Sequence, residues 1–143
     1  MNVMLDTSVL VAAMVESHPA HDRAFPWLQR GLAGEFGYLV AAHTLAELYA
    51  VLTTLPVSPR LSPGTVWRMI HENVEREARV IPLSAADYAG VLKNMSERGL
   101  SGGAIYDALI ARSAQKAGTR LLTLNIEDFR RVWPDADQRV TAP

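Results

Sequence analysis

Cysteine is absent from the 143-residue sequence. Its absence excludes disulfide bonds, thiolate zinc sites and cysteine nucleophiles, and it fits a reducing compartment. Any metal ion bound by this chain must therefore be held by oxygen or imidazole ligands.

The sequence also lacks an apolar run of the length that a membrane span requires. The longest apolar stretch near the start, residues 3–15, is interrupted by Asp6 and has neither a basic flank nor a small-residue cleavage site. We therefore expect neither a signal peptide nor a membrane helix, and we expect a cytoplasmic protein.

A surplus of basic charge is missing as well. The chain has 14 Lys and Arg residues against 15 Asp and Glu residues, which gives a formal net charge of −1. This balance argues against a protein that binds nucleic acid through an overall basic surface. If RNA is the ligand, either local clusters of basic residues or a metal ion must attract it.

About half of the residues are hydrophobic, and their arrangement predicts an α/β fold. Short apolar segments alternate with longer helical ones, which is typical of a parallel sheet with helices on both faces. No repeat or long linker divides the chain, so we expect a single domain over residues 1–143. The expected strands are 2–5, 38–42, 80–83, 120–124 and, weakly, 139–141; the expected helices are 7–14, 19–32, 44–56, 63–77, 84–99, 104–117 and 127–132.

Two acids are expected where the first two strands end. Asp6 directly follows the first strand, and ligands bind outside the carboxyl ends of parallel strands; alternatively, Asp6 only caps the helix that begins at Thr7. Glu47 stands three residues after Thr44, a spacing that predicts a capping box. Glu47 also lies one turn into the helix after the second strand, which would place its carboxylate beside Asp6.

Asp107 lies in the helical segment 103–111, where its neighbours three and four positions away are glycine, alanine and isoleucine. No basic partner is available along this helix, and a carboxylate on a small apolar face is costly without a cation or a donor. The pattern therefore favours a functional role over the alternative, a carboxylate stabilised by the helix dipole and water.

Polar oxygens also follow the fourth strand, at Asn125 and Asp128. A turn residue at Asn125 and a helix cap at Asp128 are equally consistent with the sequence. In a parallel sheet, however, all of these strand ends meet at one edge. Carboxylates gathered there repel one another and either take up protons or bind a hard divalent cation such as Mg²⁺ or Mn²⁺. Such a site suits phosphodiester hydrolysis.

Four segments carry a family resemblance. They are Met-Leu-Asp6-Thr-Ser8, Glu47-Leu-Tyr, Gly102-Gly-Ala-Ile-Tyr-Asp107-Ala-Leu-Ile-Ala and Leu122-Thr-Leu-Asn125. In this order they resemble a PIN domain and, more narrowly, the VapC toxins of bacterial toxin–antitoxin pairs, over nearly the whole chain. The resemblance implies a three-layer α/β/α fold with a mainly parallel central sheet of four or five strands. It also implies a Mg²⁺- or Mn²⁺-dependent ribonuclease that blocks translation or growth, forms a homodimer and is neutralised by a cognate VapB-type antitoxin.

The resemblance also assigns residues. By position, Asp6, Glu47 and Asp107 match the family's three main metal-organising acids, and Ser8 matches a small polar residue beside them. Many members have an aspartate after the last core strand, where this chain has Asn125 and, three residues later, Asp128 as a substitute catalytic acid. Because asparagine offers only a neutral oxygen, a second metal site would be weakened or lost.

Two arginines are candidate RNA contacts, and two other functions are compatible with parts of the sequence. Arg60 lies in the proline-rich segment 56–63, and Arg112 lies one helical turn beyond Asp107; either could equally be an ordinary surface residue. The main alternative function is a non-catalytic PIN-like module that binds RNA or a partner, which Asn125 keeps open. An aspartate-nucleophile phosphatase is disfavoured, because Ser8 stands where those enzymes usually carry a second aspartate.

Overall fold

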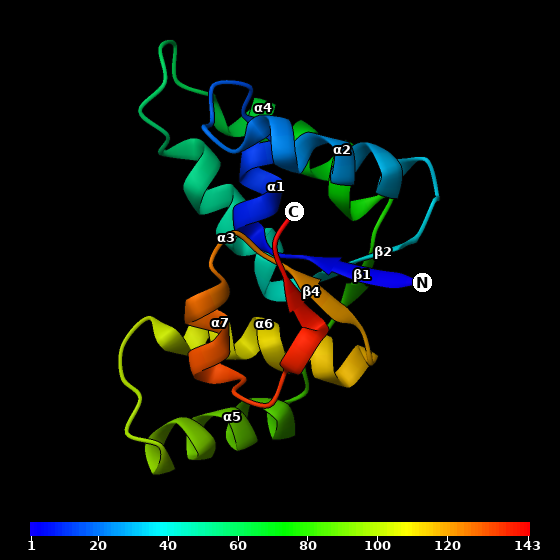
Figure 1. Cartoon of the computed structure of the whole chain (residues 1–143). Helices are drawn as coiled ribbons and strands as arrows, with labels where there is room; N and C mark the ends of the chain where they lie inside the picture. Colours follow the sequence, from blue (N-terminus) through cyan, green and yellow to red (C-terminus); the bar gives the residue numbers. More distant parts are fainter.

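The computed structural model describes the whole chain, residues 1–143. Its centre is one parallel sheet of five strands, ordered β3-β2-β1-β4-β5, so that β1 lies in the middle (Figure 1). The strands are β1 (Asn2–Leu5), β2 (Gly37–Ala41), β3 (Arg79–Ile81), β4 (Arg120–Leu122) and β5 (Val140–Thr141). From β1 the chain adds β2 and β3 on one side of the sheet and then crosses to add β4 and β5 on the other. In parallel sheets, ligands bind in the crevice where the strand order reverses in this way.

Helices cover both faces of the sheet. Helices α1 to α4 pack on one face and α5 to α7 on the other, above and below the strands in Figure 1. This arrangement confirms the predicted three-layer fold with a parallel sheet. The helices are α1 (Thr7–Met14), α2 (His21–Leu32), α3 (Ala42–Thr53), α4 (Pro63–Ile70), α5 (Ala85–Glu97), α6 (Ala104–Ala117) and α7 (Ile126–Val132), with a π-helical turn at His71–Glu75 and a 3-10 turn at Asp137–Arg139.

Alternation along the strands creates two apolar cores. In β1, Val3 and Leu5 belong to the core under α1 to α4, while Met4 belongs to the core under α5 to α7. In β4, Leu122 belongs to the core under α1 to α4, and Leu121 belongs to the core under α5 to α7. All five side chains are completely buried, as expected for central strands covered on both faces.

Local signals begin or end three helices at the predicted residues. The Ser62 hydroxyl accepts the backbone N–H of Thr65 at the start of α4, and Ser84 with Asp87 forms the predicted capping box of α5. Gly118 ends α6 with a φ of 64°. Glycine adopts this left-handed conformation without the steric cost that a side chain would bring.

The predicted capping box at the start of α3 is wrong. This helix begins at Ala42, so Thr44 already lies inside it and makes no capping hydrogen bond. A tertiary contact explains the difference: the Thr7 hydroxyl lies 3.2 Å from Oγ1 of Thr44 and donates to Oε1 of Glu47 at 2.9 Å. Glu47 therefore contacts another helix instead of the backbone of its own.

Other element bounds shift by a few residues. The second helix begins at His21 instead of Pro19, because the His18 ring accepts the backbone N–H of Ala20 in the preceding turn. The fourth strand ends at Leu122, two residues before the predicted end, so Thr123 lies just beyond the strand. No helix in the chain combines the length and the hydropathy needed to cross a membrane.

Candidate active site

Asp6 is the most buried of the candidate acids. Only 3% of its surface is exposed at the carboxyl end of β1. The hydroxyls of Ser8 and Thr123 each donate to its Oδ2 atom at 2.8 Å. The side chain makes no capping hydrogen bond to α1. Helix capping therefore does not account for this acid, whereas orientation by two hydroxyls does.

The two hydroxyls that hold Asp6 also fix the end of β4. Ser8 Oγ accepts the backbone N–H of Leu124 at 3.1 Å, and Thr123 Oγ1 accepts that of Asn125 at 3.0 Å. The backbone N–H of Asp6 donates to the Leu122 carbonyl at 2.9 Å. The segment after β4 is thus tied directly to the carboxylate that follows β1.

Glu47 projects from α3 toward the same strand ends. Its Oε1 atom accepts the Thr7 hydroxyl, as described above, and lies 3.9 Å from Nε2 of His43, one helical turn earlier. That His43 nitrogen is buried and has no hydrogen-bond partner. The imidazole and the carboxylate therefore share one face of α3, which is directed at the site.

Asp107 lies in the first turns of α6 and is half-buried. Burial and the negative charges of Asp6, Asp128 and Glu47 together raise the pKa of Asp107 to about 6, while Arg131 opposes that rise. The charges of Asp6, Asp128 and Glu47, from three other elements, therefore act on Asp107. The catalytic and metal-binding roles predicted for these four acids stay predictions.

Burial also raises the pKa of Asp6 above its ordinary value. Hydrogen bonds from Ser8 and Thr123 oppose this effect because they stabilise the charged form, and the Glu47 carboxylate adds to it. Both central acids are thus held where ionisation is costly without a cation.

Asn125 and Asp128 lie at the outer edge of the site. Both residues are exposed, and the Asp128 carboxylate is 3.9 Å from Nη2 of Arg131. Asp128 makes no hydrogen bond to another acid and affects Asp107 only through its charge. The Asn125 side chain makes no hydrogen bond within the chain. Their predicted roles in positioning water or a second ion stay predictions.

The donor set suits a hard divalent cation, since it offers carboxylate oxygens and no sulfur. The hydrogen bonds to Asp6 and Glu47 engage one oxygen of each carboxylate, Oδ2 and Oε1, and leave the other oxygen for a ligand. No three acidic or histidine side chains lie close enough together here to hold one ion. The carboxylates of Asp6, Glu47 and Asp107 would therefore have to move closer together to hold one ion.

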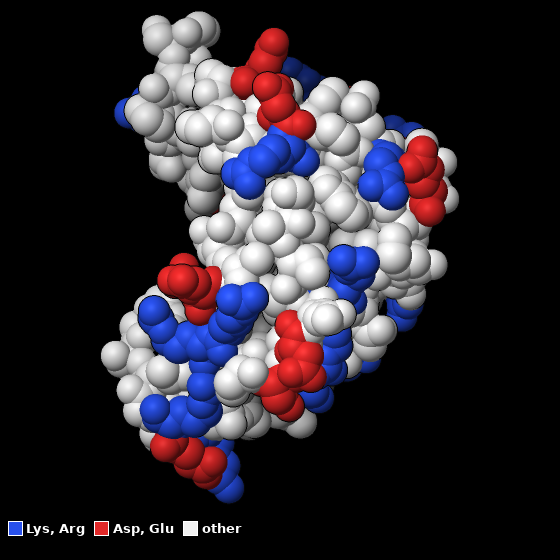
Figure 2. Space-filling model, viewed as in Figure 1, with Lys and Arg blue, Asp and Glu red and all other residues white.

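Basic side chains lie beside the acids. The face drawn in Figure 2 is indented next to α7, where acidic side chains adjoin a group of basic ones. The last turn of α7 carries Arg130 and Arg131, and the guanidinium of Arg98 donates to the Arg131 carbonyl. We call Arg98, Arg130 and Arg131 the basic rim. Of these three residues, Arg131 is the one whose charge acts on the acids, since it lies 3.9 Å from Asp128 and opposes the rise in the pKa of Asp107.

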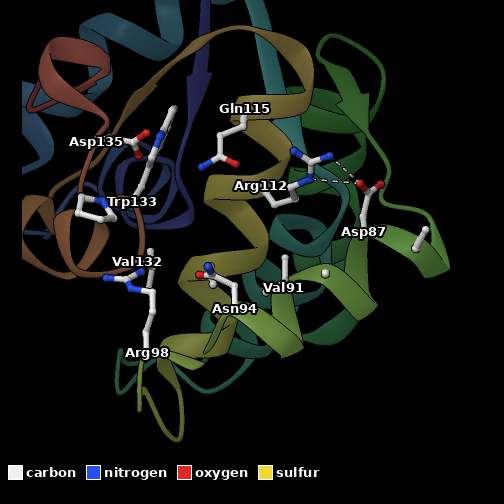
Figure 3. A pocket seen from close by; sticks show the side chains of 13 residues that line it. Asp87, Val91, Asn94, Arg98, Arg112, Gln115, Val132, Trp133 and Asp135 are labelled. Carbon is white, nitrogen blue, oxygen red and sulfur yellow. Dashed lines mark hydrogen bonds and ion pairs between the residues drawn. The ribbon is translucent and has the colours of Figure 1, made fainter. Parts of the chain in front are cut away.

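Arg112 is engaged elsewhere. Its Nε and Nη2 atoms both donate to Oδ1 of Asp87 at 3.1 Å (Figure 3). Lys116 donates to Oδ2 of the same carboxylate at 2.7 Å. Lys116, the Ser84 cap and Arg112 hold the pKa of Asp87 well below its usual range. The structure therefore gives Arg112 an ion-pairing role between α6 and α5, and its contact with RNA stays a prediction.

The Arg112–Asp87 pair lines a cavity of about 550 Å³ between α5, α6 and the residues after α7, with Trp133 on the opposite side (Figure 3). None of the four acids lines this cavity. Arg60 is exposed in the loop between α3 and α4, and its contact with RNA stays a prediction.

Sequence reasoning missed five residues that the fold brings to the acids: Thr7, His43, Tyr106, Thr123 and Arg131. Thr123 had a detectable signal, because it is a polar residue inside an otherwise apolar strand segment. Thr7 and Tyr106 stand inside segments that carry the resemblance, but nothing in those segments gave them a role. His43 and Arg131 had no signal, since a histidine or an arginine on a helix is an ordinary surface residue until a second element packs beside it.

Comparison with known proteins gives relatives over most of the chain. The PIN domain matches residues 3–133. Ribonuclease VapC40 of Mycobacterium tuberculosis is 36% identical over 121 residues, which cover 85% of this chain and 84% of the relative. Ribonuclease VapC27 of the same species is 34% identical over 119 residues, covering 83% and 81%. The crystal structure of VapBC2 from Rickettsia felis bound to a promoter DNA fragment aligns with a TM-score of 0.67 at 23% identity, covering 100% of this chain and 98% of that one.

Proposed function

This chain belongs to the PIN-domain family, and from that premise we propose that it is a Mg²⁺- or Mn²⁺-dependent ribonuclease, the VapC-type toxin of a toxin–antitoxin pair. The observation that carries the proposal is that acids from separate elements lie at the end of β1: Ser8 and Thr123 hold Asp6 there, Thr7 holds Glu47, and both acids raise the pKa of Asp107. Carboxylates that oppose one another's ionisation in a half-buried site are suited to sharing a divalent cation.

Asp6, Glu47 and Asp107 are the residues that would hold the ion. When bound, such an ion lowers the pKa of a water molecule, polarises the phosphodiester and neutralises charge that develops in the transition state. Asp128 and Asn125, at the outer edge, would orient water or help to hold a second ion.

The remaining residues orient the acids and attract the RNA. Ser8 and Thr123 fix the direction of the Asp6 carboxylate, and Thr7 fixes that of Glu47. The basic rim would contact phosphates on either side of the cleaved bond, with Arg131 nearest to the acids because it lies 3.9 Å from Asp128. RNA strands without secondary structure suit such a site, since their backbone can bend to reach recessed acids.

The partners follow from the family. Ribonuclease VapC40 and VapC27 are named as VapC proteins, and the VapBC2 structure pairs a VapC with a VapB. We infer that a cognate VapB-type antitoxin binds this chain, that the chain forms a homodimer, and that it blocks translation or growth in the cytoplasm. An antitoxin that places a basic side chain among the four acids would inhibit the enzyme directly.

The test is cleavage of a defined RNA pool by the purified chain in Mg²⁺, Mn²⁺ or EDTA. We expect cleavage only with a metal ion, and its loss in both Asp6→Asn and Asp107→Asn. Asp22→Asn is the matched control, because Asp22 is an exposed acid in the first turn of α2 and lies outside the site. Cleavage that persists in EDTA, or in either site variant, would contradict the proposal.

A non-catalytic PIN-like module remains the alternative function, and Asn125 favours it because it removes one carboxylate from the edge of the site. This alternative predicts RNA binding without cleavage under every metal condition, by protein that is folded and free of a copurified inhibitor. The same RNA pool therefore distinguishes the two functions when binding and cleavage are both measured.

A further inference from the structure

Two aromatic rings stack between the helices that carry the acids. His43 of α3 and Tyr106 of α6 have ring centroids 5.1 Å apart and planes only 3° from parallel. His43 adjoins Glu47, and Tyr106 immediately precedes Asp107 in the chain. The stacked pair thus joins α3 to α6 beside Glu47 and next to Asp107 in the chain.

Tyr106 is the exposed member of this stack. Half of its surface, 51%, is exposed, although His43 covers one face of the ring. The solvent-exposed part therefore includes the opposite face and the hydroxyl edge. A large aromatic surface left in water is costly unless a ligand covers it. No hydrogen bond within the chain uses the Tyr106 hydroxyl, so the residue is not held there by a polar contact.

Resting on the proposed ribonuclease function, we propose that Tyr106, supported by His43, is the platform on which an unpaired RNA base stacks beside the cleaved phosphodiester. Proteins that bind single-stranded RNA commonly stack bases on exposed aromatic rings, and a second ring behind the first holds the platform in place. The neighbouring Asp107 would then meet the phosphate that adjoins the stacked base.

A second exposed stack in the chain provides an internal comparison. Trp67 and His71 have centroids 4.8 Å apart and planes at 9°, and 57% of Trp67 is exposed. This pair borders a cavity with Leu45 and Tyr49. These two residues lie on the face of α3 opposite to His43 and Glu47, because residues two apart in a helix point in nearly opposite directions. The Trp67 stack is therefore a matched surface aromatic outside the site.

The experiment measures binding of an unstructured RNA oligonucleotide that carries one 2-aminopurine, in EDTA so that no metal-dependent cleavage intervenes. Stacking on an aromatic ring quenches 2-aminopurine. We expect Tyr106→Ala to weaken binding by about 5- to 100-fold and to abolish quenching. Tyr106→Phe keeps the ring and should bind as the wild type does. Trp67→Ala should also bind normally, and thermal melting followed by circular dichroism checks that each variant is folded.

The results separate three explanations. If Tyr106 only holds α3 against α6, Tyr106→Ala will bind RNA normally in EDTA and lose affinity for Mn²⁺, which overturns the platform. If the hydroxyl is the contact, Tyr106→Phe will lose as much affinity as Tyr106→Ala, which also overturns it. If the wild type cleaves RNA and Tyr106→Ala binds RNA normally, only the stacking platform is refuted. If the wild type neither binds nor cleaves RNA, the proposed ribonuclease function is refuted as well.

Discussion

The Thr123 hydroxyl donates a 2.8 Å hydrogen bond to Oδ2 of Asp6 across 117 residues of sequence. Both residues directly follow neighbouring parallel strands, β4 and β1, and both are nearly or completely buried. A threonine at the end of one strand thus orients and stabilises an acid at the end of the next. The first prediction tests this contact.

Thr123→Val keeps the shape of the side chain and removes the donor. We expect a loss of about 1 to 3 kcal/mol in the free energy of unfolding at pH 8, because a buried carboxylate loses one of its two hydroxyl partners. We also expect weaker Mn²⁺ binding in calorimetry, because the pKa of Asp6 rises further. Thr119→Val is the control, since Thr119 is also buried and donates only to the Arg120 carbonyl. Equal Mn²⁺ affinity in Thr123→Val and wild type would disprove an orienting role.

The raised pKa of Asp107 predicts a pH dependence of stability without metal. The folded protein holds the Asp107 proton up to a pH of about 6, whereas the unfolded chain releases it near the ordinary value of 3.8. The folded state therefore binds more protons between these values, and stability falls as the pH rises through this window. Asp6 shifts in the same direction and adds to the trend.

Urea unfolding in EDTA at several pH values from about 4 to about 8, which covers the window and the pH above it, checks this prediction. Asp107→Asn should flatten the profile, and Asp22→Asn should leave it unchanged. Metal binding should show the opposite trend and strengthen as the pH rises past about 6, because the ion requires the ionised carboxylate. A wild-type stability that increases with pH across this range would contradict the assigned direction.

Arg131 is the basic residue that acts on Asp107, and Arg131→Gln tests it. Removing this charge should raise the pKa of Asp107, which carbon-13 NMR of the carboxyl group can follow. It should also weaken RNA binding in EDTA and reduce the slope of log affinity against log salt by about 1. Arg30→Gln is the control, because Arg30 pairs with Glu35 at the end of α2. An unchanged salt slope would remove Arg131 from the RNA-binding surface.

The ion pair between Arg112 and Asp87 predicts a structural role for both residues. Asp87→Asn should lower the melting temperature, because it weakens contacts to Arg112, to Lys116 and to the Ser84 cap at once. Arg112→Gln should also be less stable, while both variants keep wild-type RNA affinity in EDTA. If Arg112→Gln weakened RNA binding as much as Arg131→Gln, the predicted RNA contact at Arg112 would be confirmed instead.

The sequence alone determined the kind of fold and the acids that the strand ends present. Alternating apolar strands and helices predicted the layered parallel sheet because burial on both faces leaves a clear hydrophobic pattern. Asp6, Glu47 and Asp107 were predictable because each interrupts an apolar segment next to a strand end or a helix start. The helix signals at Ser62, Ser84 and Gly118 were likewise local, and the structure confirms them.

Only the tertiary structure decided what surrounds those acids. Thr7 and Thr123 become partners of Glu47 and Asp6 through contacts 40 and 117 residues apart in the sequence. Such contacts leave no periodic pattern, because they depend on how helices and strands pack and not on local conformation. The same reason explains the one error of assignment. The Thr44 to Glu47 spacing fitted a local rule for a capping box, but Thr7, brought close by packing, is the partner of Glu47.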